Sequence, residues 1–190
     1  VNGMSDTQFT ELPTLFMEFH GNEAGLQADI AFSEELLQDN GCLEVLFEQD
    51  ERSRNQLWEL RHNLAYTYIH SAPGKRLMTT DVVVPINSLP KAIENTREKI
   101  DSMQVDAGIV GHVGDGNYHV LLMVDMNSVE EITRAKELNE HVVDFALSLG
   151  GTCTGEHGVG VSKEKYQSRE HGLAYTWMKQ IKETLDPHNI

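Results

Sequence analysis

Two histidines flank a short turn sequence near the middle of the chain, in the segment Gly111-His112-Val113-Gly114-Asp115-Gly116-Asn117-Tyr118-His119. Asp-Gly is a preferred two-residue turn of a tight β-hairpin, so His112 is predicted to lie opposite His119. Directly opposed side chains have Cβ atoms about 4.5–5.5 Å apart, which lets two imidazoles reach one metal ion. The segment therefore predicts either a metal or catalytic site, with Asn117 as a polar group on the same face, or a structural pair at a sheet edge.

A second segment with chemical potential is the glycine-rich loop at 150–160, which carries Glu156 and His157. Two histidines and one carboxylate form a ligand set used by zinc and non-haem iron sites, so Glu156 is predicted to join His112 and His119. Histidine titrates near neutral pH, so His157 is then free to move a proton. The loop lacks the Lys-Ser/Thr ending of a P-loop and the GxGxxG spacing, which argues against phosphate binding. The alternative is a flexible, solvated loop without a chemical role.

Positively charged side chains are scarce, so those inside patterned segments are candidates for binding a carboxylate. Arg61 lies in a predicted helix, and Lys75 and Arg76 follow a helix break at Pro73-Gly74. The planar guanidinium of arginine forms paired hydrogen bonds with a carboxylate. For Arg61, an ordinary ion pair between helix positions i and i+4 is the alternative.

The overall composition is acidic, with 30 Asp and Glu against 15 Lys and Arg in 190 residues and a formal net charge of −15. This balance argues against binding to nucleic acid or docking on anionic lipid through a basic patch. No apolar run approaches the roughly 20 residues of a membrane-spanning helix, and no targeting peptide is visible. Two cysteines, Cys42 and Cys153, are not a disulfide framework and indicate a reducing compartment rather than secretion. Cys153 is predicted to be a small buried residue rather than a nucleophile.

Predicted strands and helices alternate along the chain. Strands are expected at 14–19, 43–47, 79–86, 107–113 and 118–124. Helices are expected at 23–39, 52–70, 89–103, 128–149 and 173–185. Short links and one hairpin favour an α+β fold, in which an antiparallel sheet carries helices on one face. The order β-α-β occurs twice, which is compatible with two ferredoxin-like halves.

The histidine and glycine segments together resemble the C-terminal domain of FAD-linked oxidases, flavoproteins with an FAD fold of the vanillyl-alcohol-oxidase type. The resemblance is carried by 112–119 and 151–158, with further matches at 57–62, 80–85 and 185–187. It extends over nearly the whole chain and is strongest for the branches of D-lactate dehydrogenase (cytochrome) and of glycolate oxidase. It implies that residues 1–190 form one substrate-binding cap domain, cut from a longer enzyme whose N-terminal domain binds FAD.

The resemblance also implies a reaction, in which a D-2-hydroxyacid dehydrogenase oxidises D-lactate to pyruvate by hydride transfer to FAD. The positions of His112, His119 and Glu156 match those that hold a divalent metal, zinc or manganese, in such enzymes. The position of His157 matches the base that takes the hydroxyl proton. The flavin carries out the redox chemistry, and this domain supplies binding and orientation. The domain alone is therefore expected to be inactive.

The residues expected to bind the small 2-hydroxyacid substrate are Arg61, Arg76 and Asn117. Members of the family that act on 2-hydroxyglutarate carry an asparagine two residues beyond the second motif histidine, where this chain has Leu121. An apolar side chain cannot form a hydrogen bond with a distal carboxylate, which favours a short or apolar acid. No residue of this chain is assigned to FAD.

The resemblance implies partners as well: an FAD domain of the same protein, and an electron acceptor such as a cytochrome or the quinone pool. A homodimer is compatible with it. The expected location is mitochondrial in a eukaryote, and cytoplasmic or membrane-associated in a bacterium. Two other functions fit the residues. One is a stand-alone metal-dependent hydrolase that uses His112, His119 and Glu156, and the other is a non-catalytic oligomerisation domain with structural histidines.

Overall fold

A computed structural model describes residues 12–190 of the chain, which divides into two compact units, Val1–Thr67 and Tyr68–Ile190. The first unit contains α1 (Glu23–Asp39), α2 (Glu51–His62) and the beginning of α3 (Leu64–Ser71). The side chains of Asn22 and Asp50 cap the first turns of α1 and α2 by accepting backbone N–H bonds. The prediction of α1 is confirmed, whereas the single helix predicted at 52–70 is two helices that meet at Asn63.

The strands predicted at 14–19 and 43–47 are wrong, because both segments have irregular structure. Their apolar residues are mostly exposed, and Leu43 is 83% exposed. A strand is stabilised by backbone bonds to a neighbour and by burial of one face, and neither is provided for these two runs within the described part of the first unit.

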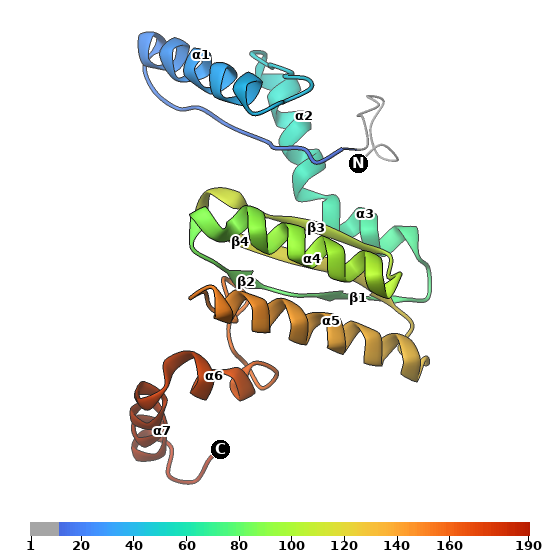
Figure 1. Ribbon diagram of the computed structural model, residues 1–190, viewed down its shortest axis with the longest axis vertical. Helices are drawn as coiled ribbons and strands as arrows, with labels where there is room; N and C mark the ends of the chain where they lie inside the picture. The colour runs from blue at the N-terminus through green and yellow to red at the C-terminus, as the bar shows by residue number, and fades with distance from the viewer. Residues whose placement is uncertain (1–11) are drawn as a thin grey trace. The chain divides into compact units, whose positions relative to one another are not determined.

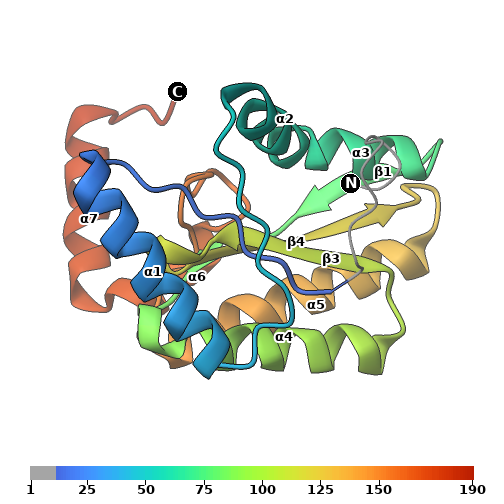
Figure 2. The same ribbon diagram turned by 90° about the horizontal axis from the view of Figure 1, so that it is seen from above.

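The second unit is built on a four-stranded antiparallel sheet (Figure 1). Its strands are β1 (Arg76–Thr79), β2 (Val82–Val83), β3 (Ala107–His112) and β4 (Asn117–Val124). Strand β4 is central, since β3 pairs with one edge and β1 and β2 pair with successive parts of the other. Helices α4 (Leu89–Met103) and α5 (Val129–Ser148) cover one face of this sheet (Figure 2). The predicted α+β architecture, with helices on one face of an antiparallel sheet, is confirmed.

The hydrophobic core lies between this face of the sheet and the two helices. Alternate residues of β4 point into it: Tyr118, Val120, Leu122 and Val124. They pack with buried residues of α4 and α5, among them Leu89, Ala92, Ile100, Leu138 and Val142. Because successive side chains of a strand point to opposite faces, Asn117 and His119 lie on the face that these helices leave free.

The ferredoxin-like order β-α-β-β-α-β is present once, in the second unit, with its last strand reduced to a bridge. The bridge joins Val83 to Thr152, and the Thr152 N–H donates to the Val83 carbonyl at 2.9 Å. It holds the beginning of the glycine-rich loop beside β2. The other predicted half is not found in residues 12–67, where both expected strands are absent.

The strand predicted at 79–86 is interrupted and shorter than expected. Residues Thr80 and Asp81 separate β1 from β2, and a short 3₁₀ helix, η1 (Ile86–Ser88), follows. At the interruption the Thr80 hydroxyl replaces a backbone acceptor, because the Val120 N–H donates to it at 2.8 Å. The gap turns a buried aspartate toward the glycine-rich loop.

The hairpin between β3 and β4 is confirmed, but its predicted register is wrong. The link contains the 3₁₀ turn η2 (Val113–Asp115) and Gly116, so it is four residues long rather than two. His112 consequently pairs with Asn117, and His119 pairs with Val110. Gly116 has a φ of 74° and packs against the Val84 carbonyl, where a side chain would not fit. This contact with Val84, the residue after β2, favours the longer link.

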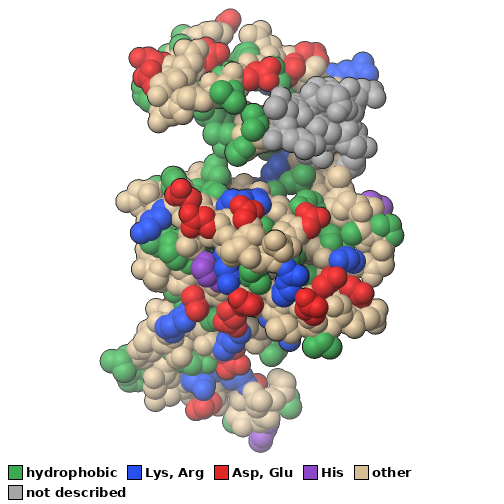
Figure 3. Space-filling model, turned by 45° about the vertical axis from the view of Figure 1, so that its right-hand side comes forward, with side chains coloured by type: hydrophobic (Ala, Val, Ile, Leu, Met, Phe, Trp, Pro, Cys, Tyr) green, Lys and Arg blue, Asp and Glu red, His purple; other side chains and the backbone are tan. Residues whose placement is uncertain are grey.

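The remaining helices are α6 (Glu164–His171), which was not predicted, and α7 (Leu173–Leu185), which was. On the face seen in Figure 3, Lys and Arg side chains lie among Asp and Glu. Two such pairs of the second unit are Lys99–Glu137 at 2.7 Å and Arg169–Asp144 at 2.6 Å. Exposed pairs of this kind add little to stability, because solvent screens them. In the part of the chain that the structure describes, every helix is too short or too polar to cross a membrane.

Candidate metal and substrate site

His119 is buried on the free face of β4, and its ring is oriented by a backbone carbonyl. Its Nδ1 lies 3.0 Å from the Thr80 oxygen. A carbonyl only accepts, so Nδ1 carries the hydrogen and Nε2 of the neutral ring keeps a lone pair. Metal-binding histidines are typically oriented in this way. Nε2 lies 2.9 Å from Oε1 of Glu156.

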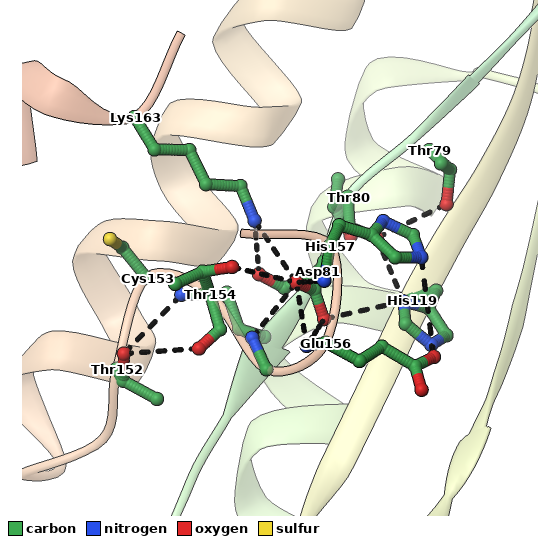
Figure 4. Close-up of polar contacts among 12 residues, drawn as sticks. Thr79, Thr80, Asp81, His119, Thr152, Cys153, Thr154, Glu156, His157 and Lys163 are labelled. Atoms are coloured by element: carbon green, nitrogen blue, oxygen red, sulfur yellow. Dashed lines mark hydrogen bonds and ion pairs between the residues drawn. The ribbon is translucent and has the colours of Figure 1, made fainter. Parts of the chain in front are cut away.

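The glycine-rich loop brings Glu156 and His157 to His119 (Figure 4). The His157 ring stacks on the His119 ring with centroids 4.9 Å apart and planes 10° apart. Nε2 of His157 lies 4.0 Å from Oε1 of Glu156. The side chains of Glu156 and His157 are 51% and 43% exposed. The cluster therefore has one buried imidazole and two groups that a small solute can reach.

Asp81 lies under this loop, and its side chain is 1% exposed. Its carboxylate accepts hydrogen bonds from the backbone N–H groups of Gly155, Glu156 and His157. Burial alone would raise the pKa of this carboxyl. The His157 N–H, the Asn117 amide and the Lys163 ammonium oppose burial and hold that pKa well below its ordinary range. Asp81 is therefore a buried anion surrounded by hydrogen-bond donors.

The donor set fits a divalent cation. With Nδ1 of His119 bonded to the Thr80 carbonyl, Nε2 and Glu156 Oε1 are two acceptors at hydrogen-bond distance, and such a pair requires a proton or a cation. Imidazole nitrogen and carboxylate oxygen are ligands that suit zinc or manganese. Ligand atoms of Asp81, His119 and His157 also lie within 4.8 Å of one another. The Asp81 oxygens are occupied by hydrogen bonds, however, which makes Glu156 the better carboxylate ligand.

His112 lies beside the cluster, at the exposed end of β3. It shares a face with Val110, so it is the diagonal neighbour of His119, and such neighbours are about 7–8 Å apart. Among residues 12–190, the group of ligand atoms within 4.8 Å does not include His112. The predicted direct pair is thus replaced by a diagonal one, and the role of His112 as a ligand stays a prediction.

Asn117 is 5% exposed and lies on the same face as His119. Its Nδ2 donates to Oδ1 of Asp81 at 3.0 Å and to the Val82 carbonyl at 3.1 Å. Its Oδ1 is buried, and no hydrogen-bond partner for it lies in the described part of the chain. A buried acceptor without a partner is costly, so this oxygen is suited to a donor that enters the site.

The two predicted arginines lie in different units of the chain. Arg61 lies on α2 of the first unit. Arg76 begins β1 and pairs with Val124, five positions along β4 from His119, which is roughly 17 Å of strand. Lys75 forms an ion pair with Glu131 at 2.9 Å. Binding of substrate by Arg61 and Arg76 stays a prediction.

Sequence reasoning missed Asp81 and Lys163. The signal for Asp81 was a single carboxylate immediately before the apolar run 82–84, because a buried charge must be paired. Lys163 is separated from Asp81 by 82 positions, and nothing local indicated that its Nζ donates to the Asp81 carbonyl at 2.9 Å. Cys153 was predicted correctly: it is buried, and burial together with the Glu170 carboxylate raises the pKa of its thiol to about 11.

Three backbone N–H groups of the glycine-rich loop are not free to bind a phosphate. A phosphate site at backbone amides needs free N–H groups. Those of residues 155–157 donate to Asp81 at 2.8–3.1 Å. This part of the loop is therefore organised around the Asp81 carboxylate.

Comparison with known proteins gives a consistent result. Residues 1–190 match the family model described as FAD linked oxidases, C-terminal domain. The chain is 38% identical over its whole length to a probable mitochondrial D-lactate dehydrogenase of Danio rerio and covers 38% of that protein. It is 36% identical over its whole length to mitochondrial D-lactate dehydrogenase [cytochrome] of Arabidopsis thaliana and covers 34% of it. Over 93% of the chain, it is 28% identical to glycolate oxidase subunit GlcD of Escherichia coli K12, of which it covers 35%.

Proposed function

Because the chain belongs to the family of FAD linked oxidases, C-terminal domain, we propose that it is the metal- and substrate-binding domain of an FAD-dependent D-2-hydroxyacid dehydrogenase. The chain spans little more than a third of the curated relatives named above, so we place the FAD in another part of a longer protein. The names of these relatives favour D-lactate as the substrate. The observation that carries the proposal is the convergence of His119 and Glu156, whose facing nitrogen and oxygen require a proton or a cation between them.

We propose His119, Glu156 and His112 as ligands of a divalent metal, zinc or manganese. Such a metal acts as a Lewis acid that makes a bound hydroxyl easier to deprotonate, and it holds the neighbouring carboxylate. The Thr80 carbonyl keeps Nε2 of His119 directed at the site, which supports its role as a ligand. Glu156 reaches the same nitrogen from the loop.

His157 is proposed as the base that accepts the hydroxyl proton at Nε2. Its ring is stacked on His119, so it borders the place where a substrate hydroxyl would lie. It is also 43% exposed, which allows the proton to pass on to solvent. FAD, when bound, would accept the hydride that leaves C2 of the substrate.

Substrate binding is proposed for Asn117 and Arg61, whereas the role of Arg76, about 17 Å of strand from His119, stays a prediction. The buried Oδ1 of Asn117 supports an acceptor role toward a donor in the site. Leu121, two positions beyond His119 on β4, is 5% exposed and provides no polar group for a second carboxylate. This supports a short 2-hydroxyacid such as lactate.

The relatives also suggest partners and a location. Several are named as cytochrome-linked and mitochondrial. We therefore propose a cytochrome as the electron acceptor and a mitochondrial location if the source is a eukaryote. A homodimer stays a prediction.

The direct test is the rate of flavin reduction in the full-length enzyme under anaerobic conditions, with D-lactate, glycolate and D-2-hydroxyglutarate compared. His119→Gln should slow reduction by D-lactate on the order of 100-fold or more while FAD stays bound. The matched control is His20→Gln, since His20 is an exposed residue of the first unit. Wild-type rates in His119→Gln would refute the proposal.

Metal content separates the ligand from the base. His157→Ala should keep the metal and slow flavin reduction, whereas His112→Ala should lose metal. If His157→Ala loses the metal and His112→Ala keeps it, His157 is a metal ligand and His112 is not.

A further inference from the structure

We propose that Asp81 is a positioning residue, whose buried carboxylate fixes the conformation of residues 154–157 and thereby aims Glu156 and His157 at His119. The consequence for metal and substrate rests on the proposed function above, which this inference deepens. Asp81 itself touches neither. Its effect is transmitted through the backbone of the loop.

Every residue of the segment 154–157 donates a hydrogen bond to the Asp81 carboxylate. Oδ2 accepts the N–H groups of Gly155, Glu156 and His157 at 2.8, 3.1 and 2.9 Å. The Thr154 hydroxyl donates to the same oxygen at 3.0 Å. A run of successive N–H groups around one anion defines a specific backbone path. Without the carboxylate, these N–H and hydroxyl groups would lose the acceptor that they share.

The side chains of Glu156 and His157 are both about half exposed. Each contacts the His119 ring, Glu156 at 2.9 Å from Nε2 and His157 by stacking. Both contacts require the backbone of the loop to bring these side chains to His119, and Asp81 holds that backbone. Figure 4 shows this arrangement: the two side chains lie on the His119 side of the loop, and Asp81 lies beneath it.

Asp81 also fixes the far end of the loop. Lys163, just before α6, donates from Nζ to the Asp81 carbonyl at 2.9 Å and to Oδ2 at 3.2 Å. The Lys163 side chain is 13% exposed, so this pair is largely shielded from solvent. Both ends of the loop from 154 to 163 are thus hydrogen-bonded to Asp81, and the Lys163 ammonium balances the buried charge of its carboxylate.

An alternative role for Asp81 is that of a metal ligand, since its oxygens lie near the two histidines. Oδ2 is already surrounded by five donors, and Oδ1 accepts from Asn117 at 3.0 Å. A metal bond to either oxygen would displace hydrogen bonds that the loop needs. A positioning role keeps all of them.

Amide hydrogen exchange tests the proposal without any need for activity. The full-length enzyme is compared with Asp81→Asn, and the matched control is Asp101→Asn, on the exposed surface of α4. In Asp81→Asn, exchange in the peptide covering 154–158 should be at least ten times faster, while peptides of β4 and α5 keep wild-type exchange. Binding of Zn²⁺ or Mn²⁺ should weaken about 10- to 100-fold, as when other supporting residues of metal sites are replaced. The control should match the wild type in both measurements.

Two outcomes would overturn the proposal: unchanged exchange at 154–158, or faster exchange with wild-type metal affinity and flavin reduction. If the metal is lost while amide hydrogen exchange at 154–158 is unchanged, the positioning role is refuted and Asp81 is a metal ligand. If the wild type binds no metal, the proposed metal site fails, and the rate of flavin reduction in Asp81→Asn decides the positioning role instead. If Asp81→Asn does not fold, Lys163→Met replaces it and should give smaller changes in the same direction.

Discussion

Gly155→Ala tests whether the site depends on the close approach of the loop to Asp81. A Cβ built at this position would lie 2.8 Å from Oδ1 of Asp81 and 2.8 Å from Cγ2 of Val83, and closer still to Nδ2 of Asn117. Ordinary contacts of a Cβ begin at 3.4 Å. Asp81 and Asn117 are buried, so the loop must move, by about 1 Å if contacts are to return to van der Waals distance.

The cost of this movement can be estimated from the bonds at risk. Three backbone N–H groups of the loop donate to the Asp81 carboxylate, and a hydrogen bond to a charged group contributes about 1.5–3 kcal/mol. Partial relaxation keeps some of them, so we expect the free energy of unfolding to fall by about 2–4 kcal/mol. A displacement of about 1 Å at a reacting group costs on the order of 100-fold in rate, which is the expected loss in flavin reduction.

Urea unfolding and stopped-flow flavin reduction measure the two effects. Gly114→Ala is the matched control, because no atom lies within 4 Å of an added Cβ there. It should resemble the wild type in both assays. The reasoning is refuted if Gly155→Ala unfolds within about 0.5 kcal/mol of the wild type and reduces its flavin at the wild-type rate.

Three further results are expected. Thr80→Val leaves the buried Val120 N–H without its side-chain acceptor, so the free energy of unfolding should fall by about 1–3 kcal/mol in urea titrations; an unchanged value would remove Thr80 from the account. The pKa of Asp81 is lowered in the folded state, so its ionised carboxylate stabilises the fold above the ordinary carboxyl pKa of about 4, and this stabilisation is lost as the pH falls below that value. In urea unfolding between pH 2.5 and 6, the free energy of unfolding should therefore fall less steeply with acid in Asp81→Asn than in the wild type, and parallel curves would contradict this. Burial raises the pKa of Cys153 to about 11, so iodoacetamide at pH 8 should label exposed Cys42 and leave Cys153 unmodified in peptide mass spectra, and labelling of both would show that the second unit opens.

Periodic helices and the main hairpin strands could be predicted from sequence. The bounds expected for α1, α4 and α7 agree with the structure, since each has apolar residues at helical spacing. Gly41 and Pro187 additionally mark the ends of α1 and α7. The runs at 14–19 and 43–47 failed because a strand depends on a partner that local sequence does not reveal. Strand identity was thus predictable only where two neighbouring runs could pair.

The site was predictable in part. Residue types and spacing singled out His119, Glu156 and His157, and the structure brings these three together. The register that would have opposed His112 and His119 failed, because contact of Gly116 with Val84 outweighed the local preference for a two-residue turn. Asp81 escaped notice for a different reason. Its partners in the loop lie more than 70 positions away, and only the fold joins them.

The proposed function depends on a divalent metal that this domain holds through His119. Elemental analysis of the purified full-length enzyme, reconstituted with Zn²⁺ or Mn²⁺ and passed through a desalting column, measures that metal directly. We expect close to one metal ion per chain in the wild type and in His20→Gln, and a near-complete loss in His119→Gln with FAD retained. Absence of metal from the wild type, or equal metal in His119→Gln, would contradict it.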